Sequence, residues 1–109
     1  MNSLIIVPDR VLGEIVEEET INFKATLINN GIKRDVTTEV EWKVVGFIGG
    51  INSQGVFTAM LSPDVAEYGE GSGTVIAIWK DTKTDEALLG KSAVFKVKAK
   101  AIFDSNTQG

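Results

Sequence analysis

The sequence predicts an all-β protein in which two facing sheets form a sandwich. Short segments alternate apolar and polar residues, turn residues separate these segments, and no apolar stripe of helical spacing extends over ten residues. The clearest alternation spans 21–27, where Ile, Phe, Ala and Leu are interleaved with Asn, Lys and Thr. Successive side chains of a strand point to opposite faces, so the apolar set can enter a core while the polar set meets water.

The pattern predicts about seven antiparallel strands, starting with a short one. This first strand covers 4–7 and is stopped by Pro8, which has no N–H to give to a ladder. The segment 9–13 predicts a kink that lets the chain change sheets. The acidic run 17–19 predicts a solvated bend, because runs of charge usually mark solvated surface.

The middle of the chain contains two long predicted strands. The second strand covers 20–28 and ends at Asn29-Asn30-Gly31, residues that tolerate the positive φ of a tight turn. The third covers 38–45 around Trp42, the largest side chain expected in the core. Glycine-containing turns then bracket a short crossing strand around Ile51.

Three further strands complete the predicted sandwich. The fifth covers 56–60, and 61–73 is expected to be a long, acidic, glycine-rich loop with one helical turn at most. The sixth strand, 74–80, is apolar on both faces, which predicts a central position in its sheet. After a turn at 81–86, the seventh strand is expected over 88–98.

A chain of 109 residues has the length of one ordinary domain. We expect 1–3 to be an N-terminal extension, 4–98 the sandwich and 99–109 a linker or disordered tail. Residues 1–3 lack the basic and apolar start of a signal peptide. The chain is expected to be a domain excised from a larger protein, and the alternative is a naturally short cytoplasmic or phage protein. Six side chains are expected in the core, where their role is stability: Phe23, Trp42, Phe57, Ala77, Phe95 and Val97.

Composition and charge narrow the classes of partner. The net charge is −4 and the chain has no basic cluster. A negatively charged domain of this kind would repel a phosphate backbone, so nucleic acid is not an expected partner. No stretch approaches the roughly 18 apolar residues of a membrane span, so membrane insertion is not expected either. The isolated domain is expected to be a monomer.

The order of several short motifs resembles that of bacterial Ig-like domains of the group 2 type. The resemblance covers about residues 4–98, and the loop 60–73 is longer than the family's usual glycine turn. The motifs are Gly13-Glu14, Ile21-Asn22-Phe23-Lys24-Ala25-Thr26, Asp35-Val36-Thr37, Val40-Glu41-Trp42, Gly55-Val56-Phe57-Thr58-Ala59, Gly73-Thr74-Val75-Ile76-Ala77 and Ala93-Val94-Phe95-Lys96-Val97.

This resemblance implies an Ig-like sandwich with Greek-key topology, used as a module of bacterial or phage surface proteins. Such a module would be a non-enzymatic spacer or adhesion unit at the cell or virion surface. Its expected partners are neighbouring domains of the same chain, another protein or a cell-surface glycan.

The residues independently favour a protein that is not an enzyme. The chain has no His and no Cys, so it cannot form the usual catalytic triads or soft-metal sites. Paired carboxylates remain a possible acid–base pair. The acidic residues, however, fall in turns or at outward positions, where nothing would bury them and raise their pKa values. No catalytic residue and no cofactor are therefore expected.

An alternative function is carbohydrate binding, which needs aromatic rings exposed to solvent. The candidates for stacking a sugar are Tyr68, Phe47 and Trp79. For Tyr68 the competing interpretation, and the one we favour, is that its ring covers one end of the core. For Trp42 burial is the expected state.

Calcium is the one metal for which the sequence offers candidate ligands. Asp81, Asp85 and Glu86 fall within one turn, and hard cations prefer several oxygen ligands at about 2.3–2.6 Å. Lys83 lies in the same segment and the spacing follows no recognised ligand pattern. A specific metal site is therefore a minor alternative here.

Overall fold

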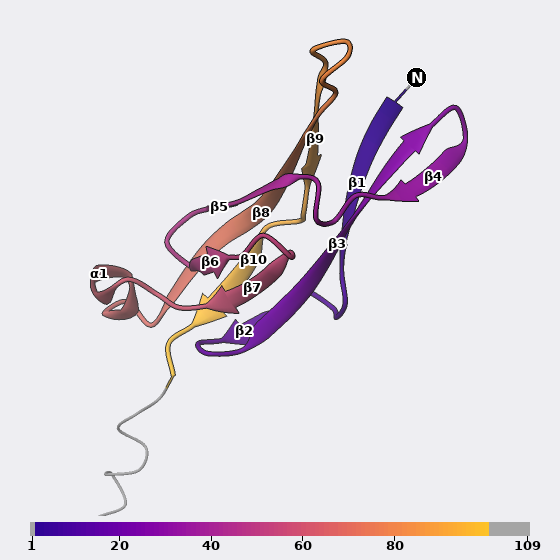
Figure 1. The fold of residues 1–109 in the computed structure, drawn as a ribbon. Helices are drawn as coiled ribbons and strands as arrows, with labels where there is room; N and C mark the ends of the chain where they lie inside the picture. The colour runs from indigo at the N-terminus through magenta and orange to yellow at the C-terminus, as the bar shows by residue number, and fades with distance from the viewer. Residues whose placement is uncertain (1, 101–109) are drawn as a thin grey trace, which may run out of the picture.

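The computed structural model describes residues 2–100, which form two β-sheets packed face to face (Figure 1). The predicted all-β sandwich is confirmed. The elements within this range are β1 (Asn2–Pro8), β2 (Glu14–Val16), β3 (Thr20–Asn29), β4 (Ile32–Asp35), β5 (Glu41–Val45), β6 (Gly49–Ile51), β7 (Val56–Ala59), α1 (Pro63–Ala66), β8 (Glu70–Lys80), β9 (Ala87–Lys91) and β10 (Phe95–Lys98).

The order of the strands is that of an immunoglobulin sandwich. One sheet has the order β1-β3-β7-β6 with β4 also paired to β3, and the other has the order β2-β10-β8-β5 with β9 also paired to β8. The first set therefore takes the places of strands A, B, E and D, and β5, β8 and β10 take those of C, F and G. Strand β2 pairs with β10 in parallel, whereas the other strand pairs within the described residues are antiparallel.

The chain changes sheets after its first strand, as the segment 9–13 predicts. Strand β1 belongs to the first sheet and β2 to the second. Asp9 fixes the end of β1, because its carboxylate accepts hydrogen bonds from the backbone N–H and the side-chain amide of Asn22 at 3.1 and 2.8 Å. Strand β1 begins at Asn2, so Asn2 and Ser3, which were expected to belong to an extension, pair with β3. Met1 and residues 101–109 of the expected tail lie outside the described residues.

Ten strands are present in residues 2–100, against about seven expected from sequence. Strands β2 and β4 are the unpredicted ones, and the predicted seventh strand is divided into β9 and β10. Ser92 explains the division, because its buried hydroxyl accepts the Val75 N–H at 3.0 Å, while its backbone N–H donates to the Val75 carbonyl at 2.9 Å. Ala93, which the alternation places inward, is exposed in the break between the two strands.

The predicted loop 61–73 is wrong beyond Gly69, because β8 begins at Glu70. Gly71 and Gly73 belong to this strand and pair with β10. A Cβ atom on Gly71 would lie 2.7 Å from the Val65 side chain, and one on Gly73 would lie 2.2 Å from the Val45 carbonyl. Glycine at these two positions therefore leaves room for close packing over a strand. The one helical turn is α1, which begins at Pro63.

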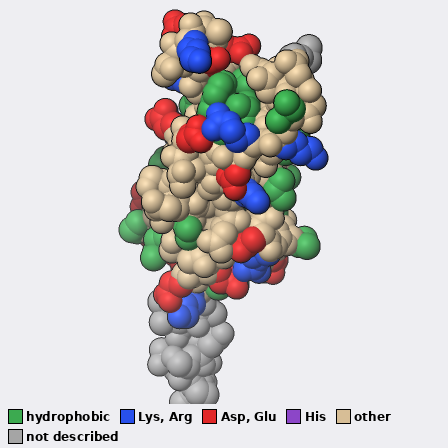
Figure 2. Space-filling view, turned by 45° about the vertical axis from the view of Figure 1, so that its right-hand side comes forward, with side chains coloured by type: hydrophobic (Ala, Val, Ile, Leu, Met, Phe, Trp, Pro, Cys, Tyr) green, Lys and Arg blue, Asp and Glu red, His purple; other side chains and the backbone are tan. Residues whose placement is uncertain are grey.

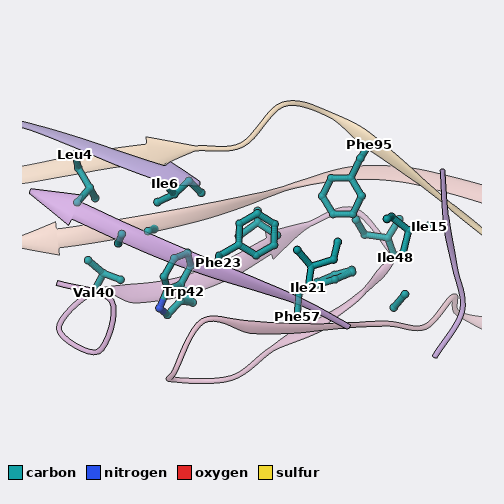
Figure 3. Packing of buried hydrophobic residues seen from close by; sticks show 14 of the residues in the cluster. Leu4, Ile6, Ile15, Ile21, Phe23, Val40, Trp42, Ile48, Phe57 and Phe95 are labelled. Atoms are coloured by element: carbon teal, nitrogen blue, oxygen red, sulfur yellow. The ribbon is translucent and has the colours of Figure 1, made fainter. Parts of the chain in front are cut away.

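The core lies between the two sheets and contains all six side chains expected there (Figure 3). Phe57 and Phe95, from opposite sheets, meet edge to face with their ring centroids 5.4 Å apart. Phe23 and Trp42 also face each other across the gap, with centroids 6.3 Å apart. These contacts between sheets hold the sandwich together, since aromatic pairs of this kind add to the free energy of burial.

Two of the motifs that resemble the Ig-like family, those that contain Thr37 and Gly55, form the site in which Trp42 packs. We call this site the seat of Trp42. The carbonyl oxygen of Thr37 accepts the Trp42 indole N–H at 2.8 Å, and the Thr37 hydroxyl oxygen accepts the Ala25 N–H at 3.0 Å. Asp35 accepts hydrogen bonds from the backbone N–H and hydroxyl of Thr37 at 2.9 and 2.6 Å. Gly55 has φ +80°, and a Cβ atom there would lie 3.0 Å from the indole ring and 2.6 Å from a backbone carbonyl. Asp35, Thr37 and Gly55 thus surround the Trp42 ring closely, and we call them the collar of Trp42.

We expect Trp42→Ala to lower the free energy of unfolding by about 3–5 kcal/mol, because it empties a large site in a packed core. Urea denaturation at pH 7 measures this change. Phe47→Ala is the matched control, since Phe47 is an aromatic residue with 74% of its surface exposed, and it should change the value by less than about 0.5 kcal/mol. A loss below about 1 kcal/mol for Trp42→Ala would contradict the core position of the ring.

Candidate functional site

Phe47 and Tyr68, the two aromatic residues proposed to stack on sugars, are both on the surface. Their side chains are 74% and 84% exposed, so the interpretation that the Tyr68 ring covers one end of the core is wrong. Phe47 follows β5 and lines a shallow depression of about 490 Å³ together with Met60 and Leu61. Tyr68 follows α1 and is not part of that lining. Sequence reasoning found exposed rings here, but not a shared site.

A second cleft lies at the other end of the sandwich, between the β3–β4 and β8–β9 hairpins, and it contains Trp79. Figure 2 shows hydrophobic side chains gathered in a hollow near the top of the molecule, where Figure 1 places both hairpins, with charged side chains around it. The cleft has a volume of about 320 Å³. Its lining residues are Leu27, Asn29, Ile32, Arg34, Trp79, Asp81 and Lys83.

The register of the two sheets explains why these residues meet. Leu27 pairs with Arg34 and Asn29 pairs with Ile32, and directly opposed residues of a pair lie on one face. On β8, Trp79 lies two residues beyond the buried Ala77 and is therefore on the inward face. The cleft is the open mouth of the space between the sheets. The sequence suggests Trp79 as a stacking residue and Asp81 as a calcium ligand, but it does not suggest Arg34 or Lys83 for any site.

Charged groups of both signs surround the cleft. The Arg34 guanidinium forms an ion pair with Glu39 at 2.7 Å. One oxygen of Asp81 accepts the Lys83 N–H at 2.9 Å, and this hydrogen bond holds the pKa of the Asp81 carboxyl below its ordinary value. Lys83 is exposed and does not take part in the ion pairs found within residues 2–100. The lining residues thus carry two cationic groups and one carboxylate.

The three calcium candidates are not assembled into a ligand set. The Asp81 carboxylate accepts the Lys83 N–H within its own turn. One oxygen of Glu86 accepts a hydrogen bond from the Asn2 side chain at 3.2 Å. Asp85 adopts a positive φ of 62° within the turn and donates its N–H to the Asp81 carbonyl. Across residues 2–100 there is no group of three or more His, Cys, Asp or Glu side chains that could hold a metal ion.

The acidic run 17–19 has a structural role that the sequence analysis did not predict. The Glu17 carboxylate accepts the backbone N–H groups of Leu61 and Lys100, each at 3.0 Å, and so joins three distant segments. The Glu19 carboxylate accepts the Val16 N–H at 2.7 Å. Glu18 is exposed and forms an ion pair with Lys100. The run is therefore a bend at the surface, as expected, but the hydrogen bonds of Glu17 and Glu19 were not part of that expectation.

Hydrogen bonds of this kind lower the carboxyl pKa values that depart from normal. In each case the largest cause is an N–H or hydroxyl group that donates to the ionised carboxylate. A carboxyl group with a lowered pKa stays ionised near neutral pH, which suits a hydrogen-bond acceptor and opposes a role as general acid. The groups are Asp9, Glu17, Glu19, Asp35 and Asp81.

Comparisons with known proteins do not assign this chain to a family. Neither the protein-family models nor the curated proteins give a match. Within residues 2–100, no helix has the length and apolar character needed to cross a membrane.

We expect Glu17→Gln to lower the free energy of unfolding by about 1–2 kcal/mol at pH 7, because an amide cannot accept both N–H groups. The folded pKa of Glu17 lies below its ordinary value of 4.5, so its contribution is present above that pH and is lost as the pH falls through the folded pKa. The gap between wild type and variant should therefore narrow below pH 4.5. Urea denaturation from pH 7 to pH 3 measures it.

Glu18→Gln is the matched control for this experiment, since it removes one neighbouring charge and only an exposed ion pair. Its effect should stay below about 0.5 kcal/mol. A stability gap for Glu17→Gln that does not change with pH would contradict the role given to its charge.

Proposed function

We propose that this chain is a bacterial Ig-like module of the group 2 type, acting as a non-enzymatic spacer or adhesion unit on a bacterial or phage surface. The support is structural. The motifs that carry the resemblance, around Asp35, Thr37 and Gly55, form the collar of Trp42 that fixes one sheet on the other. A chain that keeps these motifs keeps the sandwich, which is the property that a spacer needs.

The observation that carries the spacer function is the parallel pairing of β2 with β10. The described chain starts and ends at opposite ends of the sandwich (Figure 1). Tension along the molecule would pull β2 and β10 in opposite directions along their common axis. Their hydrogen bonds, and the Glu17 N–H to Lys98 carbonyl bond at 2.9 Å beside them, would have to break together. This arrangement resists extension better than bonds that open one at a time.

The carboxylates support a function without catalysis. The five carboxylates with a perturbed pKa accept hydrogen bonds from backbone or side-chain N–H and hydroxyl groups, which lower the pKa of each. A carboxylic acid poised to donate a proton would show the opposite shift. We propose that the module works as a monomer and meets its neighbours through its two ends.

Pulling the molecule from its two chain ends should require a higher force than pulling the two hairpins of one end apart. The first direction shears β2 against β10, whereas the second separates strands progressively. Single-molecule force spectroscopy measures both in the same protein. The chain has no cysteine, so Lys33→Cys and Lys83→Cys supply unique handles on the exposed hairpins. An equal or lower force between the chain ends would contradict the spacer function.

Surface display predicts that antibodies raised against this chain label intact cells or virions of the source. The expected result is equal labelling before and after permeabilisation, read by flow cytometry or by immunogold microscopy. An antibody against an internal protein is the control. Labelling that requires permeabilisation would contradict the proposed location.

Carbohydrate binding is a second candidate function, favoured by the solvent exposure of Phe47 and Tyr68. Exposed aromatic rings are a normal platform for the apolar face of a sugar. We expect isothermal titration against a panel of neutral and acidic polysaccharides to detect binding to at least one of them. No heat of binding across the whole panel would contradict this candidate and would leave the spacer function untouched.

A further inference from the structure

We propose that the cleft between the β3–β4 and β8–β9 hairpins binds a carboxylated sugar unit, with Trp79 as the stacking surface and with Arg34 and Lys83 as partners of the carboxylate. This inference rests on carbohydrate binding, the second candidate function. It names the ligand class and assigns a site different from Phe47 and Tyr68.

The cleft is built by two strands that the seven-strand immunoglobulin plan does not contain. Strand β4 is inserted between strands B and C, and β9 is inserted between strands F and G. Both insertions extend the same end of the sandwich (Figure 1). By analogy, this is the end at which variable immunoglobulin domains carry the B–C and F–G loops that contact antigen. Binding sites are commonly formed by elements added to a fold that many proteins share, and here such elements flank one cleft on both sides.

The floor of the cleft is apolar and continuous with the core. Trp79 is only partly buried and continues the inward row of Val75 and Ala77 to the edge of the core. Opposite it, Leu27 ends the inward row of β3 and is 5% exposed. Trp79 is also held by its ladder position opposite Leu88 in β9. A partly buried ring at the edge of a packed core can contact a sugar and loses little further freedom on binding.

The polar groups around this floor suit a sugar that carries a negative charge. Arg34 and Lys83 approach from opposite hairpins, in a chain whose net charge is −4. One guanidinium nitrogen of Arg34 donates to Glu39 at 2.7 Å, and a guanidinium has further N–H groups with which to bind a ligand. Asp81, the acidic residue of the lining, turns one oxygen toward the Lys83 N–H. Asn29 offers an amide that can donate to and accept from sugar hydroxyls. Guanidinium and ammonium groups form charge-assisted hydrogen bonds with carboxylates, which supply both affinity and orientation.

The size of the cleft fits one or a few sugar rings rather than a protein surface. Its volume of about 320 Å³ is near the lower limit of small-molecule sites, which span roughly 300–1,000 Å³. Long glycans can continue beyond it, because the mouth opens between two exposed hairpin tips (Figure 2).

The test is an NMR titration with oligosaccharides of galacturonate, mannuronate and glucuronate, each paired with its neutral counterpart. The chain has two tryptophans, so the indole N–H signals report Trp79 and the buried Trp42 separately. We expect at least one uronate oligosaccharide to shift the Trp79 signal and leave the Trp42 signal in place. Its neutral counterpart should bind about tenfold more weakly or worse, as expected for the loss of hydrogen bonds to charged groups.

Three variants locate the binding. Trp79→Ala should weaken it about tenfold or more, as for a central aromatic contact. The double variant Arg34→Gln and Lys83→Gln should weaken it by a similar factor. Lys33→Gln is the matched control, because Lys33 adjoins Arg34 in β4 but pairs with Ile28 on the other face of the strand. It should leave the affinity unchanged. The Trp42 indole signal reports whether each variant retains the native core.

Each other outcome contradicts a defined part of the inference. Binding that survives Trp79→Ala but is lost in Phe47→Ala or Tyr68→Ala would overturn the cleft and keep the carbohydrate function. Equal affinity for neutral and carboxylated sugars would overturn the assigned ligand class. No binding to any oligosaccharide would overturn this inference together with the carbohydrate candidate.

Discussion

The structure depends on the seat of one side chain, Trp42, at the place where the two sheets face each other. Its indole N–H is bonded to Thr37, its ring lies against Phe23, and Gly55 leaves the space that the ring fills. These contacts come from segments on both sheets. They fix the distance and offset of the sheets, because a large ring in a close-packed site has few alternative positions. The spacing of the sheets that Trp42 sets also determines the shape of the cleft at Trp79.

Alternation of side chains was sufficient to predict the core, but not the length or number of strands. The inward positions of β3 and β8 were predictable because one face of each strand is buried. Strand β4 has four exposed residues, so it carries no signal of period two. The sequence predicts a loop at Gly71 and Gly73, whereas both belong to β8, because glycine serves both for turns and for close packing. Only the three-dimensional packing distinguishes these two uses.

Side chains that act at a distance were the hardest to predict. Glu17 bonds to backbone groups 44 and 83 residues away, and nothing in its local sequence distinguishes it from Glu18. The same limit applies to the cleft. Exposure of Phe47 follows from an unpaired loop, whereas the meeting of Arg34 with Trp79 depends on the register of two separate sheets. Sequence can suggest single residues of such a site, but the fold determines which of them lie close together.

The two ends of the sandwich are built differently. At one end, Glu17 ties β2, the segment before α1 and the last described residues into one unit, which holds the parallel strands in place. At the other end, two hairpins extend past the core and carry Arg34 and Lys83 on exposed positions. Asp35, at the end of β4, bonds to Thr37 and so connects this hairpin to the packing of Trp42, whereas Arg34 and Lys83 have side chains that are not part of those contacts. If the proposals above hold, substitutions at Arg34 and Lys83 would alter the ligand without removing the hydrogen bonds between β2 and β10.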